Sequence, residues 1–182
     1  MAEQTPSTPP ALEIRIRHAR RRDIPALVSL FRAHLEYHAA LDPRYEPGSN
    51  AQLTQFFNER LRDPDTLILL AEAPQGAVGY VLAQMRGPYR TLSWWERLWW
   101  RLSPQNAFVS TATVAYLADC FVVPESRRQG IGRRLVQQAL EWCQKRGARE
   151  VELGVLPDNP LGRAFWEALG FKPCRIEMRR EL

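Results

Sequence analysis

The run from Leu117 to Leu135 constrains the fold more than any other stretch of the chain. Its first seven residues are rich in β-branched and aromatic side chains, which are typical of a strand. Pro124 ends that strand, because proline has no amide proton to donate to a sheet ladder. From Ile131 onward, apolar residues recur at helical spacing, so a helix is predicted to begin near Gly130. The run is therefore a strand that turns directly into a helix.

The turn itself has the features of an anion-binding site. Gly130 and Gly132 each cost about 1 kcal/mol against Ala in a helix, so they indicate a backbone that must approach a ligand closely. A helix N-terminus presents unpaired amide protons and a partial positive charge. Arg127, Arg128 and Arg133 add full charges. A pyrophosphate fits these features best; the alternative is a basic helix cap without a ligand.

Two familiar phosphate loops do not match this turn. A Walker loop needs Lys followed by Ser or Thr after its last glycine, and here Arg133 and Arg134 follow. The dinucleotide fingerprint needs a third glycine where Leu135 stands. What remains is the pattern Arg-x-x-Gly-x-Gly on a strand-to-helix turn.

The remaining elements predict a single α+β domain. Residues 1–11 are predicted to be a disordered tail, and 12–182 one domain without internal repeats. Periodicity predicts strands at 13–17, 66–73, 79–85, 111–123, 150–155 and 174–181, and helices at 22–41, 53–61, 130–146 and 159–169. This order indicates a mixed, mainly antiparallel sheet flanked by helices on both faces.

A second motif, from Asn159 to Phe171, is a helix led by Asn that closes in Gly-Phe. Together with the Arg-x-x-Gly-x-Gly turn and the element order, it resembles the GNAT acyltransferase superfamily over about residues 13–182. The resemblance implies an acetyl-CoA-dependent N-acetyltransferase that moves an acetyl group to a primary amine by direct attack in a ternary complex. It also implies that the strands at 119–123 and 151–155 splay apart to admit the pantetheine arm.

The resemblance assigns cofactor contacts residue by residue. Main-chain groups of the strand would bind the pantetheine, one strand amide would polarise the thioester carbonyl, and the turn would bind the pyrophosphate. The residues implied in coenzyme A binding are Phe121, Val122, Val123, Arg127, Arg128, Gln129, Gly130, Ile131, Gly132, Arg133, Asn159, Phe165 and Trp166.

The catalytic groups are less directly implied. Family members usually carry Tyr where Trp166 stands, as the acid that protonates the leaving thiolate. Indole N–H cannot supply a proton near neutral pH, so Trp166 is expected to pack on the pantetheine instead. A thiolate is a tolerable leaving group without an acid. For the base, Asp119 and Tyr116 are the two candidates.

The first two helices and their connection would line the acceptor pocket in such a fold. Tyr37, His38 and Tyr45 are therefore candidates for substrate contact. His34 and His38 also invite a metal-site interpretation, but no third ligand is evident, and no metal is expected.

Residues 86–112 form an insertion that departs from the family pattern. This segment contains four of the six tryptophans, with one apolar face if it is helical. Three interpretations stay open: a lid over the acceptor pocket, a dimer surface, or a membrane-surface helix.

Composition bounds the remaining function classes. The chain has no apolar run of membrane-spanning length, no signal-like N-terminus and three cysteines without a metal pattern, so a soluble cytoplasmic protein is expected. The net charge of +5 comes from separated arginine groups, and no nucleic-acid partner is expected. A homodimer is a family-level expectation. Two rival functions are an acyl-CoA-binding regulatory module that has lost catalysis and a basic interaction protein that uses the Trp-rich segment.

Overall fold

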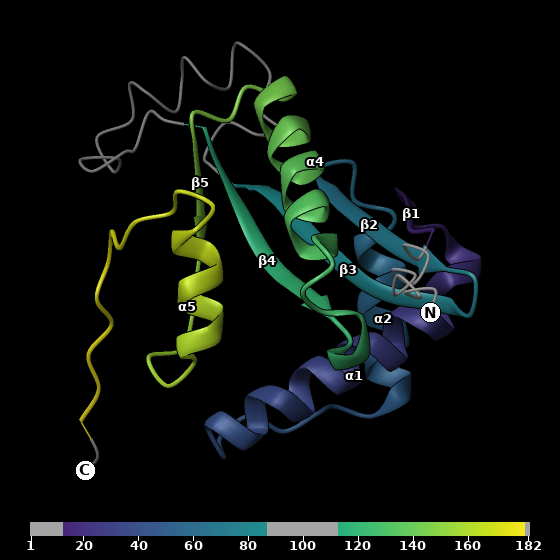
Figure 1. Cartoon of the computed structure of the whole chain (residues 1–182), viewed down its shortest axis with the longest axis horizontal. Helices are drawn as coiled ribbons and strands as arrows, with labels where there is room; N and C mark the ends of the chain where they lie inside the picture. Colours follow the sequence, from purple (N-terminus) through teal and green to yellow (C-terminus); the bar gives the residue numbers. More distant parts are fainter. Residues whose placement is uncertain (1–12, 87–112, 181–182) are drawn as a thin grey trace, which may run out of the picture.

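A computed structural model describes residues 13–86 and 113–180. Its centre is a five-stranded sheet in the order β1-β2-β3-β4-β5, antiparallel except for the parallel pair of β4 and β5 (Figure 1). The strands are β1 (Arg15–His18), β2 (Thr66–Ala73), β3 (Gly76–Arg86), β4 (Val114–Val122) and β5 (Glu150–Leu153).

Helices cover both faces of the sheet. Helices α1 (Ile24–Leu41) and α2 (Asn50–Arg60) pack on one face, around the buried rings of Phe57 and Tyr80. Helices α4 (Ile131–Lys145) and α5 (Pro160–Glu167) pack on the other, around Leu135 and Val136. Short 3-10 turns, η1 (Arg21–Asp23) and η2 (Pro124–Ser126), precede α1 and α4. None of the described helices has the length and apolarity needed to cross a membrane.

The predicted mixed α+β sheet with helices on both faces is confirmed, but the predicted strand at 174–181 is wrong over its described part. Residues 171–180 have no regular secondary structure, and Ile176 and Met178 are 86% and 92% exposed. Alternating apolar residues form a strand only where their backbone groups meet a partner edge. Here Arg175 reaches only a side chain of β5, with 4.0 Å between its guanidinium and the Glu152 carboxylate. The Trp-rich segment lies outside the described residues.

Strand β4 carries a bulge at Ala118. Leu117 pairs with Ala83 and Asp119 pairs with Leu82, so two steps along β4 match one step along β3. The extra residue is Ala118, which packs against the cluster under α1 and α2. A bulge of this kind locally inverts the alternation of a strand.

The inversion decides where the second half of β4 points. Ala115 and Leu117 pack on the α4 side before the bulge, whereas Cys120 and Val122 pack there after it. Asp119, which strict alternation would place beside Leu117, instead lies toward α1. The bulge thus brings a carboxylate to the face that α1 covers.

The pairing of β4 with β5 is short. It runs from Val114 opposite Glu150 to Leu117 opposite Leu153, and β4 continues to Val122 without β5 beside it. The two ribbons diverge beyond this point (Figure 1). The second half of β4 therefore pairs with β3 along one edge. Its other edge, on the side from which β5 has diverged, has no strand beside it.

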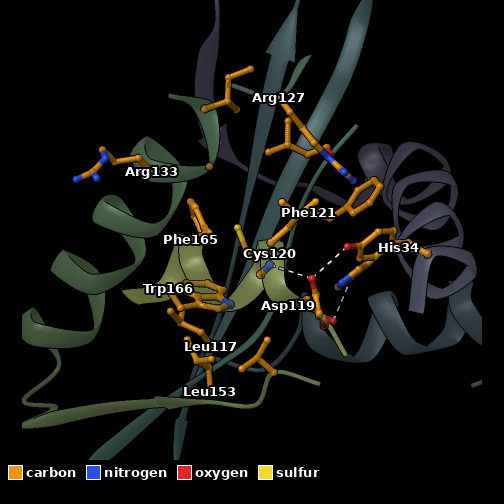
Figure 2. A pocket seen from close by; sticks show the side chains of 18 of the residues that line it. His34, Leu117, Asp119, Cys120, Phe121, Arg127, Arg133, Leu153, Phe165 and Trp166 are labelled. Atoms are coloured by element: carbon orange, nitrogen blue, oxygen red, sulfur yellow. Dashed lines mark hydrogen bonds and ion pairs between the residues drawn. The ribbon is translucent and has the colours of Figure 1, made fainter. Parts of the chain in front are cut away.

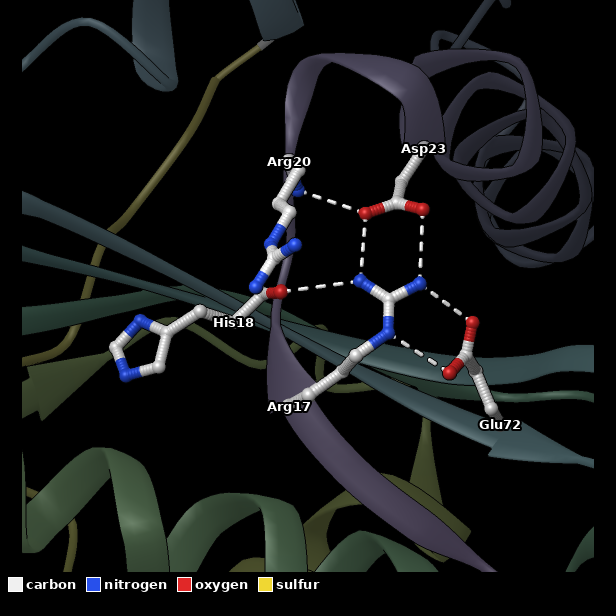
Figure 3. Close-up of polar contacts among 5 residues, drawn as sticks. All are labelled: Arg17, His18, Arg20, Asp23 and Glu72. Atoms are coloured by element: carbon white, nitrogen blue, oxygen red, sulfur yellow. Dashed lines mark hydrogen bonds and ion pairs between the residues drawn. The ribbon is translucent and has the colours of Figure 1, made fainter.

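One ionic cluster fastens the first strand to the rest of the fold (Figure 3). The Arg17 guanidinium donates to Asp23 at 2.7 and 2.8 Å and to Glu72 of β2 at 2.5 and 2.8 Å. Asp23 also accepts from the Arg20 backbone amide at 2.7 Å. The bond to Arg17 lowers the pKa of Asp23 to about 2. One planar side chain thus joins β1, β2 and the start of α1.

We expect Arg17→Gln to destabilise the protein by about 2–3 kcal/mol, because it leaves two carboxylates without their cation at a partly buried position. Arg17→Lys should recover only part of this loss, since an ammonium cannot bind two carboxylates in bidentate fashion. Chemical denaturation at pH 7 measures both.

The same cluster predicts a pH dependence. The carboxyl of Asp23 contributes stability above its unfolded pKa near 3.8 and loses it as the pH falls through about 2. The difference between wild type and Arg17→Gln should therefore shrink between pH 4 and pH 2. Arg62→Gln, at an exposed position, is the control and should change stability by less than about 0.5 kcal/mol. An equal loss in both variants would contradict the assignment.

Candidate active site

A cavity of about 480 Å3 lies where β4 and β5 separate. Five segments contribute to its walls: α1, the second half of β4, the turn into α4, the end of β5, and α5 with the loop before it. In Figure 2, Leu117 and Leu153 lie at one end of the cavity, and Arg127 and Arg133 lie at the other. The cavity thus connects the point of strand separation with the arginine-rich turn.

The arginine-rich end is built by left-handed backbone. Arg128 has a φ of 60° and Gly130 a φ of 75°. The left-handed region costs a side-chain-bearing residue about 1 kcal/mol, so the conformation at Arg128 marks a functional candidate. Gly130 is the N-cap of α4, and no described side chain caps it. The first amides of α4 are therefore available to an anion.

Gly132 is needed for a different reason. A Cβ atom at this position would stand 3.3 Å from the Phe165 ring of α5, which is a tight contact. The glycine therefore lets α5 approach the first turn of α4. That approach brings Phe165 and Trp166 to the cavity wall.

The other feature of the cavity is a buried polar group beside α1. Nδ1 of His34 lies 3.0 Å from the Tyr80 hydroxyl and 3.5 Å from a carboxylate oxygen of Asp119. The His34 ring also stacks on Phe121, with 5.2 Å between centroids. The imidazole therefore packs against both β3 and β4, with the Asp119 carboxylate beside it (Figure 2).

Burial sets the charge of these groups. It raises the pKa of Asp119 to about 7, and together with the neighbouring His38 and Arg127 it lowers the pKa of His34 to about 3. Burial also lowers the pKa of His38. Desolvation disfavours every charged form here, so both imidazoles are neutral at pH 7 and the carboxyl is poised between its two forms.

Cys120 is next to Asp119 in the sequence, but its thiol is not activated as a nucleophile. Burial, with the nearby Asp119 charge, raises the pKa of its thiol to about 12. A thiol rather than a thiolate is present at neutral pH, and only the thiolate is a nucleophile.

Two side chains bridge the walls of the cavity. Arg127 donates from Nε to the Val122 carbonyl at 2.9 Å, and its guanidinium lies 5.4 Å from the Tyr37 ring centroid. Asn159 is 7% exposed; its Oδ1 accepts from the Gly162 amide at 2.9 Å and from the Tyr37 hydroxyl at 3.1 Å. The Asn159 side chain therefore caps α5 and also joins it to α1.

Main-chain geometry identifies the amides that face the open side of β4. The Val123 amide donates to the Val78 carbonyl at 2.9 Å, so it points toward β3. Along a strand, amides alternate between the two edges. Those of Val122 and Cys120 therefore point away from β3, toward the side that β5 has left.

Most of the residues predicted from sequence line this cavity. They are Tyr37, His38, Asp119, Phe121, Val122, Arg127, Arg128, Gly130, Ile131, Gly132, Arg133, Asn159, Phe165 and Trp166. Four others, Tyr45, Tyr116, Val123 and Gln129, are not part of its lining.

Tyr116 lies apart for a structural reason. It precedes the bulge, and the Arg86 guanidinium stacks 3.4 Å above its ring centroid. Its hydroxyl lies against Gly154, since a Cβ atom added to that glycine would stand 3.3 Å from the hydroxyl oxygen. The structure therefore places Asp119, and not Tyr116, beside His34 in the cavity wall.

His34 was missed as a site residue, because the sequence suggested only a metal site for it. A usable signal was present: His34, Tyr37 and His38 follow the i, i+3, i+4 spacing of one helix face. All three line the cavity.

The pKa of Asp119 has a consequence for stability. The folded protein keeps this proton up to about pH 7, whereas the unfolded chain loses it near 3.8, so this group lowers stability as the pH rises between these values. Asp119→Asn should therefore stabilise the protein at pH 8 by on the order of 2 kcal/mol and by much less at pH 5. Urea unfolding at both values measures this.

Glu59→Gln, an exposed carboxylate change on α2, serves as the control and should show no such pH-dependent gain. A loss of stability in Asp119→Asn that is equal at the two pH values would contradict the burial argument.

Comparison with known proteins gives relatives of similar length. The chain is 27% identical over 158 residues to the uncharacterized N-acetyltransferase YhfO of Bacillus subtilis, covering 86% of this chain and 89% of that one. It is 25% identical over 142 residues to an aminoglycoside N(6')-acetyltransferase type 1 of Salmonella typhimurium, covering 78% and 87%.

Solved structures share the fold. The aminoglycoside N-acetyltransferase AAC(6')-Iy in complex with CoA matches with a TM-score of 0.68 and 21% identity, over 96% of this chain and 99% of that one. A mutant of the BH1408 protein from Bacillus halodurans matches with a TM-score of 0.76 and 18% identity, over 92% and 98%.

The family model described as the acetyltransferase (GNAT) family matches residues 27–171, which span α1 to the end of α5 and include the whole cavity lining. This confirms the family expected from the two motifs, and with it the class of an acetyl-CoA-dependent acyltransferase. The chain belongs to the acetyltransferase (GNAT) family.

Proposed function

We propose that this protein transfers an acetyl group from acetyl-CoA to a primary amine by direct attack within a ternary complex. The observation that carries the proposal is a single cavity that joins an uncapped, arginine-flanked helix start to a partly buried carboxylate. The first feature suits a pyrophosphate, and the second suits an amine that must lose a proton.

The chain's own residues fit coenzyme A. Arg128, Arg133 and the amides of Gly130 to Gly132 would hold the pyrophosphate at the start of α4. The open edge of β4 would hold the pantetheine arm, with the amides of Cys120 and Val122 facing it. Phe165 and Trp166 would cover the arm from α5. Asn159 keeps its side-chain NH2 group for the same arm, because its oxygen already accepts two hydrogen bonds.

The reaction needs a proton acceptor on the protein. Acetyl-CoA supplies the acetyl group as a thioester, whose carbonyl carbon bonds to the amine nitrogen while the C–S bond breaks and the sulfur leaves. Asp119, which lies beside His34, takes the proton that the ammonium must lose before the attack, and the second proton that the nitrogen sheds after the attack goes to the leaving thiolate, so that coenzyme A departs as a thiol. Cys120 is not needed as a carrier, because its thiol stays protonated.

Trp166 favours one alternative. It stands where an acid is usual in the family, and its ring packs edge-on against Phe165 and Phe171, with centroid distances of 4.9 and 5.4 Å. A chain without that acid could bind acyl-CoA as a regulatory module without turning it over. The carboxyl of Asp119 argues for turnover, because a binding module has no use for a carboxyl that is poised to take up a proton.

The relatives named as aminoglycoside N(6')-acetyltransferases support a small amine as acceptor. A cytoplasmic location and a homodimer stay predictions.

Calorimetric titration with coenzyme A, run beside a thiol-release assay over a panel of amines, tests the proposal. We expect binding and amine-dependent thiol release. Gly130→Glu should weaken coenzyme A binding at least tenfold, because it sets a carboxylate against the pyrophosphate and forces a side chain into the left-handed region.

Gly147→Glu is the matched control, since Gly147 also has a left-handed φ, of 84°, but stands at the other end of α4. Its coenzyme A affinity should be unchanged. Equal affinity in the wild type and Gly130→Glu would sink the pyrophosphate assignment, and binding without thiol release from any amine would favour the regulatory module.

The role of Asp119 predicts a pH profile. At saturating amine, kcat should rise with pH and level off above about 7, because the carboxyl accepts a proton only when ionised. Asp119→Asn should lower kcat by about 10²–10⁴ and abolish the step near pH 7. Glu59→Gln should keep both the wild-type kcat and its rise near pH 7. If kcat of Asp119→Asn still rises near pH 7, another residue is the base.

A further inference from the structure

A series of aromatic rings leads from the buried carboxylate to the surface. The His34 ring stacks on Phe121 at 5.2 Å and 27°, and the His38 ring follows at a centroid distance of 4.4 Å. Tyr45, which is 39% exposed, continues the series 5.8 Å from His38. We call Phe121, His34, His38 and Tyr45 the ring wall. Its inner part is buried beside Asp119, and its outer end meets solvent.

The ring wall carries no charge at neutral pH. Burial keeps both imidazoles unprotonated, and the other two rings are Phe and Tyr. Aromatic faces attract flat apolar groups and single cations alike. Three of its rings, His34, His38 and Phe121, line the cavity, and Tyr45 lies beyond the cavity lining. The wall therefore offers aromatic contact without offering a counter-ion.

Counter-ions for a cationic acceptor are scarce around the cavity. Among the described residues that line it, Asp119 is the single carboxylate. Asp42, just beyond the end of α1, is already bound by the Arg44 side chain at 2.7 Å.

These observations limit the acceptor. A polycation would bring several ammonium groups into a site with one described carboxylate, and each unpaired charge that loses water is costly. A molecule with one ammonium would satisfy Asp119, and its body would lie along the rings. We infer that the acceptor is a primary monoamine on a flat aromatic or apolar body, rather than a polycation such as an aminoglycoside. This inference rests on the proposed N-acetyltransferase activity.

Thiol-release kinetics with acetyl-CoA and a defined amine panel test the inference. The aromatic monoamines are phenethylamine and tryptamine, and the polycations are spermidine and kanamycin. We expect kcat/KM for the aromatic monoamines to exceed that for each polycation at least tenfold. A preference for kanamycin or spermidine would overturn the inference and leave the proposed function standing. Thiol release with none of the four amines would overturn both.

A substitution in the ring wall gives a second, independent test. His38→Glu adds a carboxylate to the cavity wall, and His38→Gln is the neutral control at the same site. The ratio of kcat/KM for putrescine, a diamine, to that for butylamine, a monoamine of similar length, should rise about tenfold in His38→Glu and stay near the wild-type value in His38→Gln. An unchanged ratio in His38→Glu would show that counter-ion number does not set the preference and would overturn the inference.

Discussion

The early end of the β4–β5 ladder is the constraint on which the rest of the site depends. Beyond Leu117 and Leu153 the parallel partner is gone, and the open edge of β4 must satisfy its backbone groups in another way. Arg127 takes one of them, the Val122 carbonyl. The remaining edge, with α5 on one side and α1 on the other, becomes a cavity instead of a continued sheet. The bulge at Ala118 then turns Asp119 toward α1 at the level where that edge opens.

The two ends of the cavity rely on opposite electrostatic conditions. At the start of α4, exposed guanidinium groups and unpaired amides present positive charge to water, and a strongly charged ligand can keep much of its hydration. Beside α1, burial suppresses charge altogether, so that a carboxyl and two imidazoles sit near neutrality. A cofactor with charged phosphates at one end and a neutral thioester at the other would match this gradient.

Local patterns explain what the sequence could reveal. The strand, the proline, the glycines and the arginines of the turn lie within nineteen consecutive positions, 117–135, so the residues that meet at the arginine-rich end of the cavity were predictable almost residue by residue. The order of strands and helices along the chain followed from periodicity, except for the strand expected at 174–181. The orientation of Asp119 did not, because it depends on a bulge that only the register with β3 defines. The contacts of His34 could not be predicted either, because they are made with Tyr80 and Asp119, which lie 46 and 85 positions away in the sequence.

The failures of prediction also have physical causes. The pattern Cys174, Ile176, Met178 alternates as a strand should, but alternation says nothing about whether an edge is present to receive it. Val123 directly follows the last residue of β4, and its amide donates to the Val78 carbonyl. A family resemblance can therefore indicate which strand would bind the ligand. Which of its amides face the ligand is known only once the pairing register with the neighbouring strand is known.

The hydrogen bond between Tyr37 and Asn159 makes the two walls of the cavity mechanically dependent. Asn159 caps α5 and accepts from Tyr37 with one and the same oxygen, and the Tyr37 ring also lies against the Arg127 guanidinium. A molecule that takes hold of the Asn159 amide on the α5 side therefore acts on the orientation of a ring on the α1 side. We therefore expect occupation of one half of the cavity to change the free energy of filling the other, and thermodynamic linkage requires such an effect to be the same in both directions.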